Sequence, residues 1–133
     1  MVVYSTGMVL LPRHIYINKT TLESLSNQEL FELELSNLKL AVFCGCETGK
    51  GGEGANNLPT VAVQKGAGTA IGFQGKIQCS DANQWTERFF YYLSVGHTVQ
   101  SACNMIKNST VLQWKSKTTI DTFVICGNKQ AVF

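Results

Sequence analysis

The stretch LAVFCGCETGKGGEG, residues 40–54, decides the fold of this chain and places its candidate site. Its apolar part belongs to a continuous run, Leu38–Cys44, which is typical of a strand buried on both faces of a parallel sheet. Two cysteines one residue apart follow this run, and the residues after Cys46 include the acid Glu47, a threonine and four glycines. In sheets that helices cover, functional sites lie at the carboxyl ends of the strands. The sequence therefore predicts that a site of this chain includes the turn that contains Cys44 and Cys46.

Turn residues and apolar periodicity divide the rest of the chain into further elements. Four more segments favour strands, namely residues 1–6, 14–18, 66–73 and 121–128. Four segments favour helices, namely residues 27–33, 57–65, 81–95 and a segment that begins after residue 98. This order predicts an α/β fold in which a mainly parallel sheet is flanked by helices. A length of 133 residues fits one domain, 1–133.

Capping residues define the ends of three of these helices. Pro59 suits the first turn of one helix, and Gly66 is placed to end it. Asp81 opens the clearest helix, and Gly96 ends it. Thr98 is placed to cap the next one.

Composition and charge exclude several classes of function. The net charge is +2, and no cluster of lysine and arginine is interleaved with aromatic residues, so we expect no nucleic-acid partner. No apolar run approaches the ~20 residues of a spanning helix, and no signal peptide is recognisable, so we expect a cytoplasmic protein without membrane contact. The five cysteines lack the spacing of a disulfide framework, which predicts reduced thiols.

Two kinds of ligand site fit the cysteine–glycine stretch poorly. A phosphate loop of the Walker type needs four residues between its glycines and a hydroxyl residue after its lysine. Here three residues separate Gly45 from Gly49, and Lys50 is followed by Gly51. A metal site can take two thiolates from a Cys-x-Cys pair, but no second pair of ligands follows. The sequence therefore predicts neither a cofactor nor a metal.

A third interpretation is covalent catalysis. A cysteine just past a buried strand, beside small residues and before a helix, is well placed to act as a nucleophile. Glycine neighbours let a substrate approach and let amide N–H groups point at an oxyanion. A cysteine in a glycine turn with no catalytic role fits the same residues. The residue pattern by itself favours the non-catalytic cysteine, and a catalytic cysteine remains the alternative.

The stretch LAVFCGCETG resembles the LVVLSACETG signature of CHAT domains, the caspase-like cysteine peptidases of clan CD, which are related to gingipain, clostripain and separase. The similarity continues through NLPTVAVQKGAGTAIGFQGKI and DANQWTERFFYYLSVGHTVQSACNMI to TFVICGN, which resembles the closing strand. It covers residues 2–128. The resemblance implies a caspase-like sheet flanked by helices, and cysteine-peptidase chemistry on peptides or proteins.

The resemblance assigns roles to the residues of the turn. Cys46 takes the position of the nucleophile, which attacks the peptide bond to form a thioester. Gly45 and the backbone of Cys46 lie where the family builds its oxyanion hole. Glu47, Thr48 and Gly49 complete the signature, and we expect their hydrogen bonds to orient the cysteine.

Three residues are placed by the resemblance near the wall of a substrate pocket. Cys44 stands two positions before the nucleophile, where some clan members carry an acid for basic substrates. Gln74 and Asp81 follow the strand within residues 66–73. Asp81 also fits a helix cap. Trp85 and Phe89 share a helical face, which favours the core over a substrate subsite.

The catalytic histidine of the family is missing from its expected place. Aligned on the family's Gly-His-Gly turn, the histidine position is taken by Gly7, which is 39 residues before Cys46, and Thr6 and Met8 flank it. Glycine can neither stabilise a thiolate nor protonate a leaving amine. His14 is the candidate substitute, on the return arm of a hairpin. His97 follows a glycine at a helix start, which favours capping or solvent exposure.

Two functional hypotheses follow. The first is a degenerate caspase-like domain that is inactive by itself and serves as an interaction or structural module. The second is an active cysteine endopeptidase that uses Cys46, with His14 or a histidine from a partner. Caspase-like domains begin with strands that have no counterpart here, so we expect a domain incomplete at its N-terminus. Its sheet would then expose an edge, which predicts a homo-oligomer.

Overall fold

The computed structural model describes residues 8–11, 39–44 and 46–133. Three of the predicted elements, at residues 1–6, 14–18 and 27–33, lie outside the described residues. Gly7, His14 and Gly45 also lie outside them. The description below concerns the remaining part of the chain.

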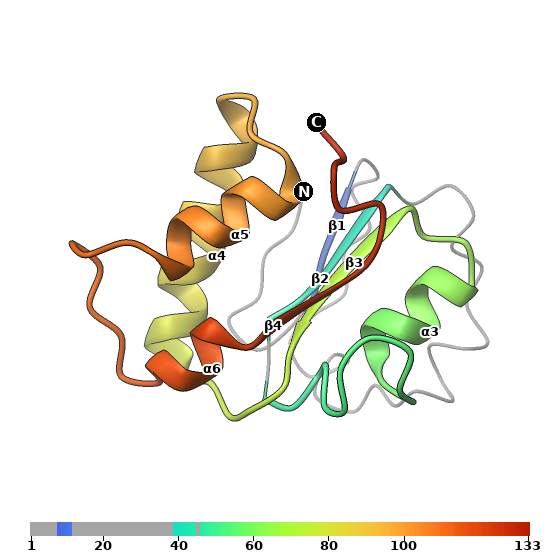
Figure 1. Cartoon of the computed structure of the whole chain (residues 1–133), viewed down its shortest axis with the longest axis horizontal. Helices are drawn as coiled ribbons and strands as arrows, with labels where there is room; N and C mark the ends of the chain where they lie inside the picture. The colour runs from blue at the N-terminus through green and yellow to red at the C-terminus, as the bar shows by residue number, and fades with distance from the viewer. Residues whose placement is uncertain (1–7, 12–38, 45) are drawn as a thin grey trace.

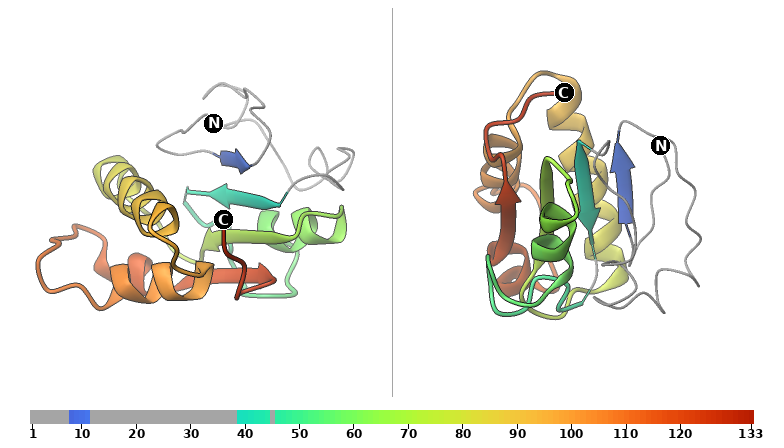
Figure 2. Two further views of the ribbon diagram at one scale, coloured as in Figure 1. Left: turned by 90° about the horizontal axis from the view of Figure 1, so that it is seen from above. Right: turned by 90° about the vertical axis from the view of Figure 1, so that its right-hand side faces the viewer.

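The described strands form one sheet in the order β1-β2-β3-β4. Figure 2 shows β1 and β4 at its two edges. The four strands are β1 (Met8–Leu11), β2 (Leu40–Phe43), β3 (Thr69–Phe73) and β4 (Phe123–Gly127). β2 and β3 are buried along their whole length, as the apolar run predicted for β2.

Helices cover both faces of this sheet, which confirms the α/β fold. Figure 1 shows α3 on one side of the sheet and α4, α5 and α6 on the other. The helices are α3 (Leu58–Gln64), α4 (Cys79–Ser94), α5 (Val99–Lys107) and α6 (Lys117–Asp121). α6 was not predicted, because five residues are too few to show a helical period. None of the described helices has the length and apolarity needed to cross a membrane.

The described sheet is mixed, so the expectation of a mainly parallel sheet was wrong for these strands. Only β2 and β3 are parallel, and they are joined through α3. β4 runs antiparallel to β3 because the chain returns to the end of β3 before β4 begins: the Gln74 amide donates to Thr122 O over 3.3 Å. β1 pairs antiparallel with β2. It includes Met8, which the alignment on the histidine turn had placed in that turn.

The predicted cap of α5 and the predicted end of α3 are confirmed, and α3 also has an N-cap that was not predicted. Asn57 Oδ1 accepts a hydrogen bond from Thr60 N over 3.1 Å at the start of α3. Gly66 follows α3 with φ 108°, a conformation that favours glycine. Thr98 Oγ1 accepts from Ser101 N over 3.0 Å at the start of α5. The signals at Gly66 and Thr98 act within four residues, which is why the sequence alone predicts them.

The longest described helix begins earlier than the sequence predicts. α4 starts at Cys79 with Gln78 as its N-cap residue, so Asp81 lies in the first turn instead of at the cap. The helix ends at Ser94, and Gly96 follows with φ 98°, as expected.

α4 packs its apolar face on the sheet through aromatic side chains. The ring of Trp85 meets that of Phe73 edge-on at 5.0 Å and stacks on that of Phe89 at 4.7 Å. All three side chains are fully buried. Trp85 and Phe89 therefore belong to the core, as their helical spacing indicates.

Candidate active site

The turn after β2 is tied to the ends of two strands by one hydroxyl group. Thr48 Oγ1 donates to Phe43 O over 2.8 Å and accepts from Phe73 N over 3.1 Å. Because β2 and β3 are parallel, both bonds fall at the carboxyl end of the sheet. Thr48 thus fixes the turn where the sequence predicted the site.

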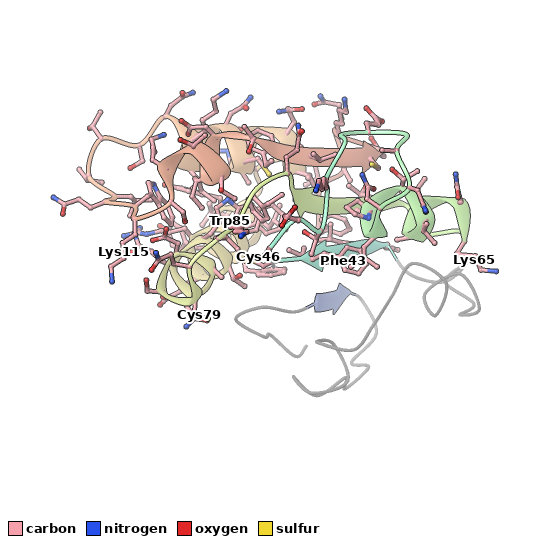
Figure 3. The ribbon with its side chains drawn as sticks, turned by 90° about the horizontal axis from the view of Figure 1, so that it is seen from below. Phe43, Cys46, Lys65, Cys79, Trp85 and Lys115 are labelled. Carbon is pink, nitrogen blue, oxygen red and sulfur yellow. The ribbon has the colours of Figure 1, made fainter. Side chains whose placement is uncertain are left out.

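Cys46 is exposed, and its thiol lies against the backbone that leads into α4. Its Sγ donates to Ile77 O and accepts from Ile77 N, both over 3.3 Å. Figure 3 labels Cys46 and Cys79 at the end of the molecule where β2 ends and α4 begins. No pattern in the sequence indicated Ile77, which is 31 residues from Cys46 along the chain and bonds to it through main-chain atoms.

The amides that follow Cys46 are used to hold the turn in place. Glu47 N donates to Gly75 O over 2.8 Å, and Gly49 N donates to Phe73 O over 2.8 Å. Neither N–H can therefore point at an oxyanion in this arrangement. Glu47 has a φ of 55°, which is uncommon for a residue other than glycine, and its carboxylate pairs with Lys50 over 3.1 Å at the surface.

Two glycines let the turn approach β3 closely. A Cβ atom on Gly72 would lie 2.6 Å from Pro59 Cγ and 3.1 Å from Gly49 N. A Cβ atom on Gly49 would lie 3.1 Å from Phe73 N. The glycine of the Cys-Glu-Thr-Gly signature is therefore needed for packing of the turn on the sheet.

The glycine-rich part of the stretch is held by a residue that the sequence marked only as the start of a helix. Asn57 Nδ2 donates to Lys50 O over 3.1 Å and to Gly52 O over 2.8 Å. Gly54 N donates to Thr60 Oγ1 over 3.1 Å. Asn57 is 4% exposed, so the loop is fastened to the first turn of α3 from inside.

Cys44 belongs to the core instead of a pocket wall. It is fully buried, and its Sγ donates to Ala82 O on α4 over 3.5 Å. Burial raises the pKa of the Cys44 thiol to about 12, although a hydrogen bond with Thr86 works against that shift. The thiol of Cys44 is therefore protonated and shielded, and we correct its assignment to the substrate pocket.

Asp81 acts as a structural carboxylate. It is 3% exposed and accepts from Lys115 N over 3.1 Å, from Ser116 N over 2.7 Å and from Ser116 Oγ. Burial alone would raise the pKa of Asp81, but the hydrogen bonds from Ser116 and Lys115 outweigh it and hold the pKa below the usual range. All of its bonds stabilise the segment before α6, so Asp81 offers no free oxygen pair to a basic substrate.

Gln74, in contrast, is exposed, beside the start of β4.

His97 lies far from Cys46. Its Nδ1 is 3.4 Å from Ser101 Oγ, and its ring meets that of Tyr92 at 5.7 Å. α4 has 16 residues and so extends about 24 Å between the segment at Ile77 and the segment at His97. The described part of the chain brings no histidine to Cys46, and no group of three or more His, Cys, Asp or Glu there is placed to hold a metal ion.

The family model of the CHAT domain matches residues 5–113. The chain belongs to the CHAT domain family. It is thus a caspase-like, peptidase-related domain, as the Cys-Glu-Thr-Gly turn indicated. The match includes the turn of Cys46 and the position of Gly7, and it ends before β4. No curated protein and no solved structure matches this CHAT domain.

Proposed function

We propose that this CHAT domain has lost peptide-bond turnover and acts by binding a peptide or protein partner. The observation that carries the proposal is the environment of the nucleophile position. Cys46 Sγ is engaged with Ile77 N and Ile77 O, and no described histidine is near it. A cysteine peptidase needs an imidazole that takes the thiol proton and then protonates the leaving amine.

The surrounding backbone supports the same proposal. The amides of Glu47 and Gly49 bond to Gly75 O and Phe73 O, so neither can add a donor to an oxyanion hole at Gly45 and Cys46. The Cys46 thiol is exposed, and the turn around it is rigidly hydrogen-bonded.

The intact turn also favours a second candidate function, an active cysteine endopeptidase. Thr48 fixes the signature at the carboxyl end of the sheet, where such a nucleophile is required. Cys46 is accessible to a substrate. In this hypothesis His14, or a histidine of a partner, serves as the acid and base.

The deciding experiment is the pH dependence of Cys46 alkylation by iodoacetamide, followed by mass spectrometry of the full chain. Cys79 is exposed like Cys46 and serves as the internal reference, and buried Cys44 reports any unfolding. An unperturbed cysteine titrates near ~8.5, whereas a catalytic cysteine is often depressed to ~3.5–7.5. The proposal predicts that Cys46 follows the profile of Cys79 and that a library of fluorogenic peptides is not hydrolysed.

A matched pair of variants separates the two functions. His14→Ala removes the candidate base, and His97→Ala is the control at the far end of α4. Rapid alkylation of Cys46 near pH 6 that disappears in His14→Ala, together with peptide hydrolysis lost in Cys46→Ser, would establish the peptidase and refute the inactive module. If the pH profile of Cys46 alkylation is the same in the wild type, His14→Ala and His97→Ala, the result supports the inactive binding module.

A further inference from the structure

The five thiols of the chain fall into two groups that differ in access. Cys46 and Cys79 are exposed, whereas Cys44, Cys103 and Cys126 are buried. Burial raises the pKa of each of the three buried thiols and so keeps them protonated. Because the thiolate is the form that reacts with an oxidant, oxidation of this chain is confined to Cys46 and Cys79.

α4 runs past the end of β2 in the opposite direction to the strand. Cys44 Sγ donates to Ala82 O over 3.5 Å. Cys46 Sγ contacts Ile77 N and Ile77 O, both over 3.3 Å. Cys79 is the first residue of α4 and lies between these two contact points, two residues after Ile77 and three before Ala82. Its backbone is therefore beside the segment that carries Cys46.

The spacing along α4 also sets the direction of the Cys79 side chain. Cys79 is seven residues, or about two helical turns, before Thr86, so the two share one face of the helix. Thr86 is buried on the face that meets β2, where its side chain hydrogen-bonds the Cys44 thiol. Ser80 is turned from Cys79 by about 100° around the helix. Figure 3 shows Cys46 and Cys79 at the same end of the molecule.

We propose that Cys46 and Cys79 form a reversible disulfide and that a peroxide is the oxidant. The peroxide oxidises one of the two thiolates to a sulfenic acid: the O–O bond breaks, sulfur takes one oxygen, and hydroxide leaves. The second thiol then attacks this sulfur, which forms the S–S bond and releases water. Two electrons pass from the thiol pair to the peroxide. A dithiol returns both cysteines to thiols by exchange.

The disulfide changes the candidate site whichever function that site has. In the bridge, Cys46 has no S–H to donate to Ile77 O, and its sulfur is no longer a nucleophile. The rest of the turn stays anchored, because Thr48 binds the ends of β2 and β3 independently of the thiol. The inference goes beyond the proposed function, since the bridge requires neither a partner nor an imidazole.

The experiment treats the reduced full chain with hydrogen peroxide and blocks the remaining thiols with N-ethylmaleimide. A tryptic digest is then analysed by mass spectrometry without reductant. Trypsin releases Cys46 in the peptide of residues 40–50, together with Cys44, and Cys79 as the sole cysteine of the peptide of residues 77–88. The expected product is a monomer in which these peptides are linked through Cys46. Blocking of Cys46 and Cys79 is expected to be lost together and to return after dithiothreitol.

Three variants test the pairing, and circular dichroism checks that each is folded. Cys79→Ser is expected to abolish the bridge and to leave a sulfenic acid on Cys46 that dimedone traps. The double variant Cys79→Ser/Ser80→Cys moves the thiol by one position, out of the face shared with Thr86, and is expected not to form the bridge. Cys103→Ala removes a buried thiol and is expected to form the bridge like the wild type.

A disulfide joins Cα atoms that are ~4.4–6.8 Å apart, so the product tests the placement of the two cysteines directly. A bridge that contains Cys44, or one that joins two molecules, overturns the proposal. Oxidation of Cys46 without a bridge, or two thiols that both stay open to blocking, overturns it as well. Bridging by Cys79→Ser/Ser80→Cys at the wild-type level overturns the role of the helix face. None of these results depends on peptide hydrolysis, so this inference and the proposed function can fail separately.

Discussion

Cys44 and Cys46 are two residues apart, yet they belong to regions held by different forces. Cys44 lies on the buried side, within the aromatic packing of α4 on the sheet. Cys46 lies on the exposed side, in a turn that is held by hydrogen bonds to strand ends and to Ile77. The reactivity of each of these two thiols therefore depends on whether it lies in the buried core, like Cys44, or in the exposed turn, like Cys46.

The difference shows how the domain can lose chemistry without losing its fold. The buried region is stabilised by the burial of apolar surface, and this effect does not depend on the direction of individual contacts. The exposed turn depends on the placement of a few donors and acceptors, such as Thr48 Oγ1. A change in the turn should therefore alter access to Cys46 while the aromatic region remains folded.

The largest expected effect is on the buried side. Trp85→Ala removes a fully buried ring that contacts Phe73 and Phe89, and should lower the free energy of unfolding by about 3–5 kcal/mol. Trp85 Nε1 has no hydrogen-bond partner among the described residues, so Trp85→Phe should cost much less. Urea denaturation measures both. Equal losses in the two variants would mean that packing of the ring is not what stabilises this region.

An intermediate effect is expected at Asp81, whose carboxylate ties α4 to the segment before α6. Asp81→Asn should lower the free energy of unfolding near neutral pH by about 1.5–3 kcal/mol, because hydrogen bonds to a charged acceptor are lost. The folded pKa of Asp81 lies below its unfolded value. Its stabilisation is therefore present above about pH 4 and is lost as the pH falls through the folded pKa.

Denaturation curves at several pH values check this prediction. The wild type should lose stability in acid, and Asp81→Asn should lose less over the same interval. Asp121→Asn is the matched control, since Asp121 pairs with Lys117 at the surface of α6 and its replacement should change stability little. If Asp81→Asn lost more stability in acid than the wild type, the proposed role of Asp81 would be contradicted.

The smallest effect on stability is expected in the turn. Thr48→Val keeps the shape of the side chain but leaves Phe43 O and Phe73 N without this partner, which should cost about 1–2 kcal/mol. Thr48→Ser keeps the hydroxyl and is the control. The alkylation rate of Cys46 should change in Thr48→Val and not in Asp81→Asn. Unchanged alkylation in both would mean that Thr48 does not position the cysteine.

Much of the fold was predictable because its signals are local. The apolar run of β2, the cap at Thr98 and the stops at Gly66 and Gly96 each act within one strand or one helical turn. The antiparallel direction of β4 was not predictable, since it depends on where α6 returns the chain. The family signature identified the turn of Cys46 but not its partners.

The sequence by itself therefore determined the α/β fold, the C-terminal ends of α3 and α4, and the position of the candidate site. Only the tertiary structure decided that Cys44 is buried and Cys46 exposed, that Asp81 binds Ser116, and that Cys46 contacts Ile77. The physical reason is distance along the chain. These contacts join residues more than thirty positions apart, and they exist only because packing of α4 on the sheet brings them together.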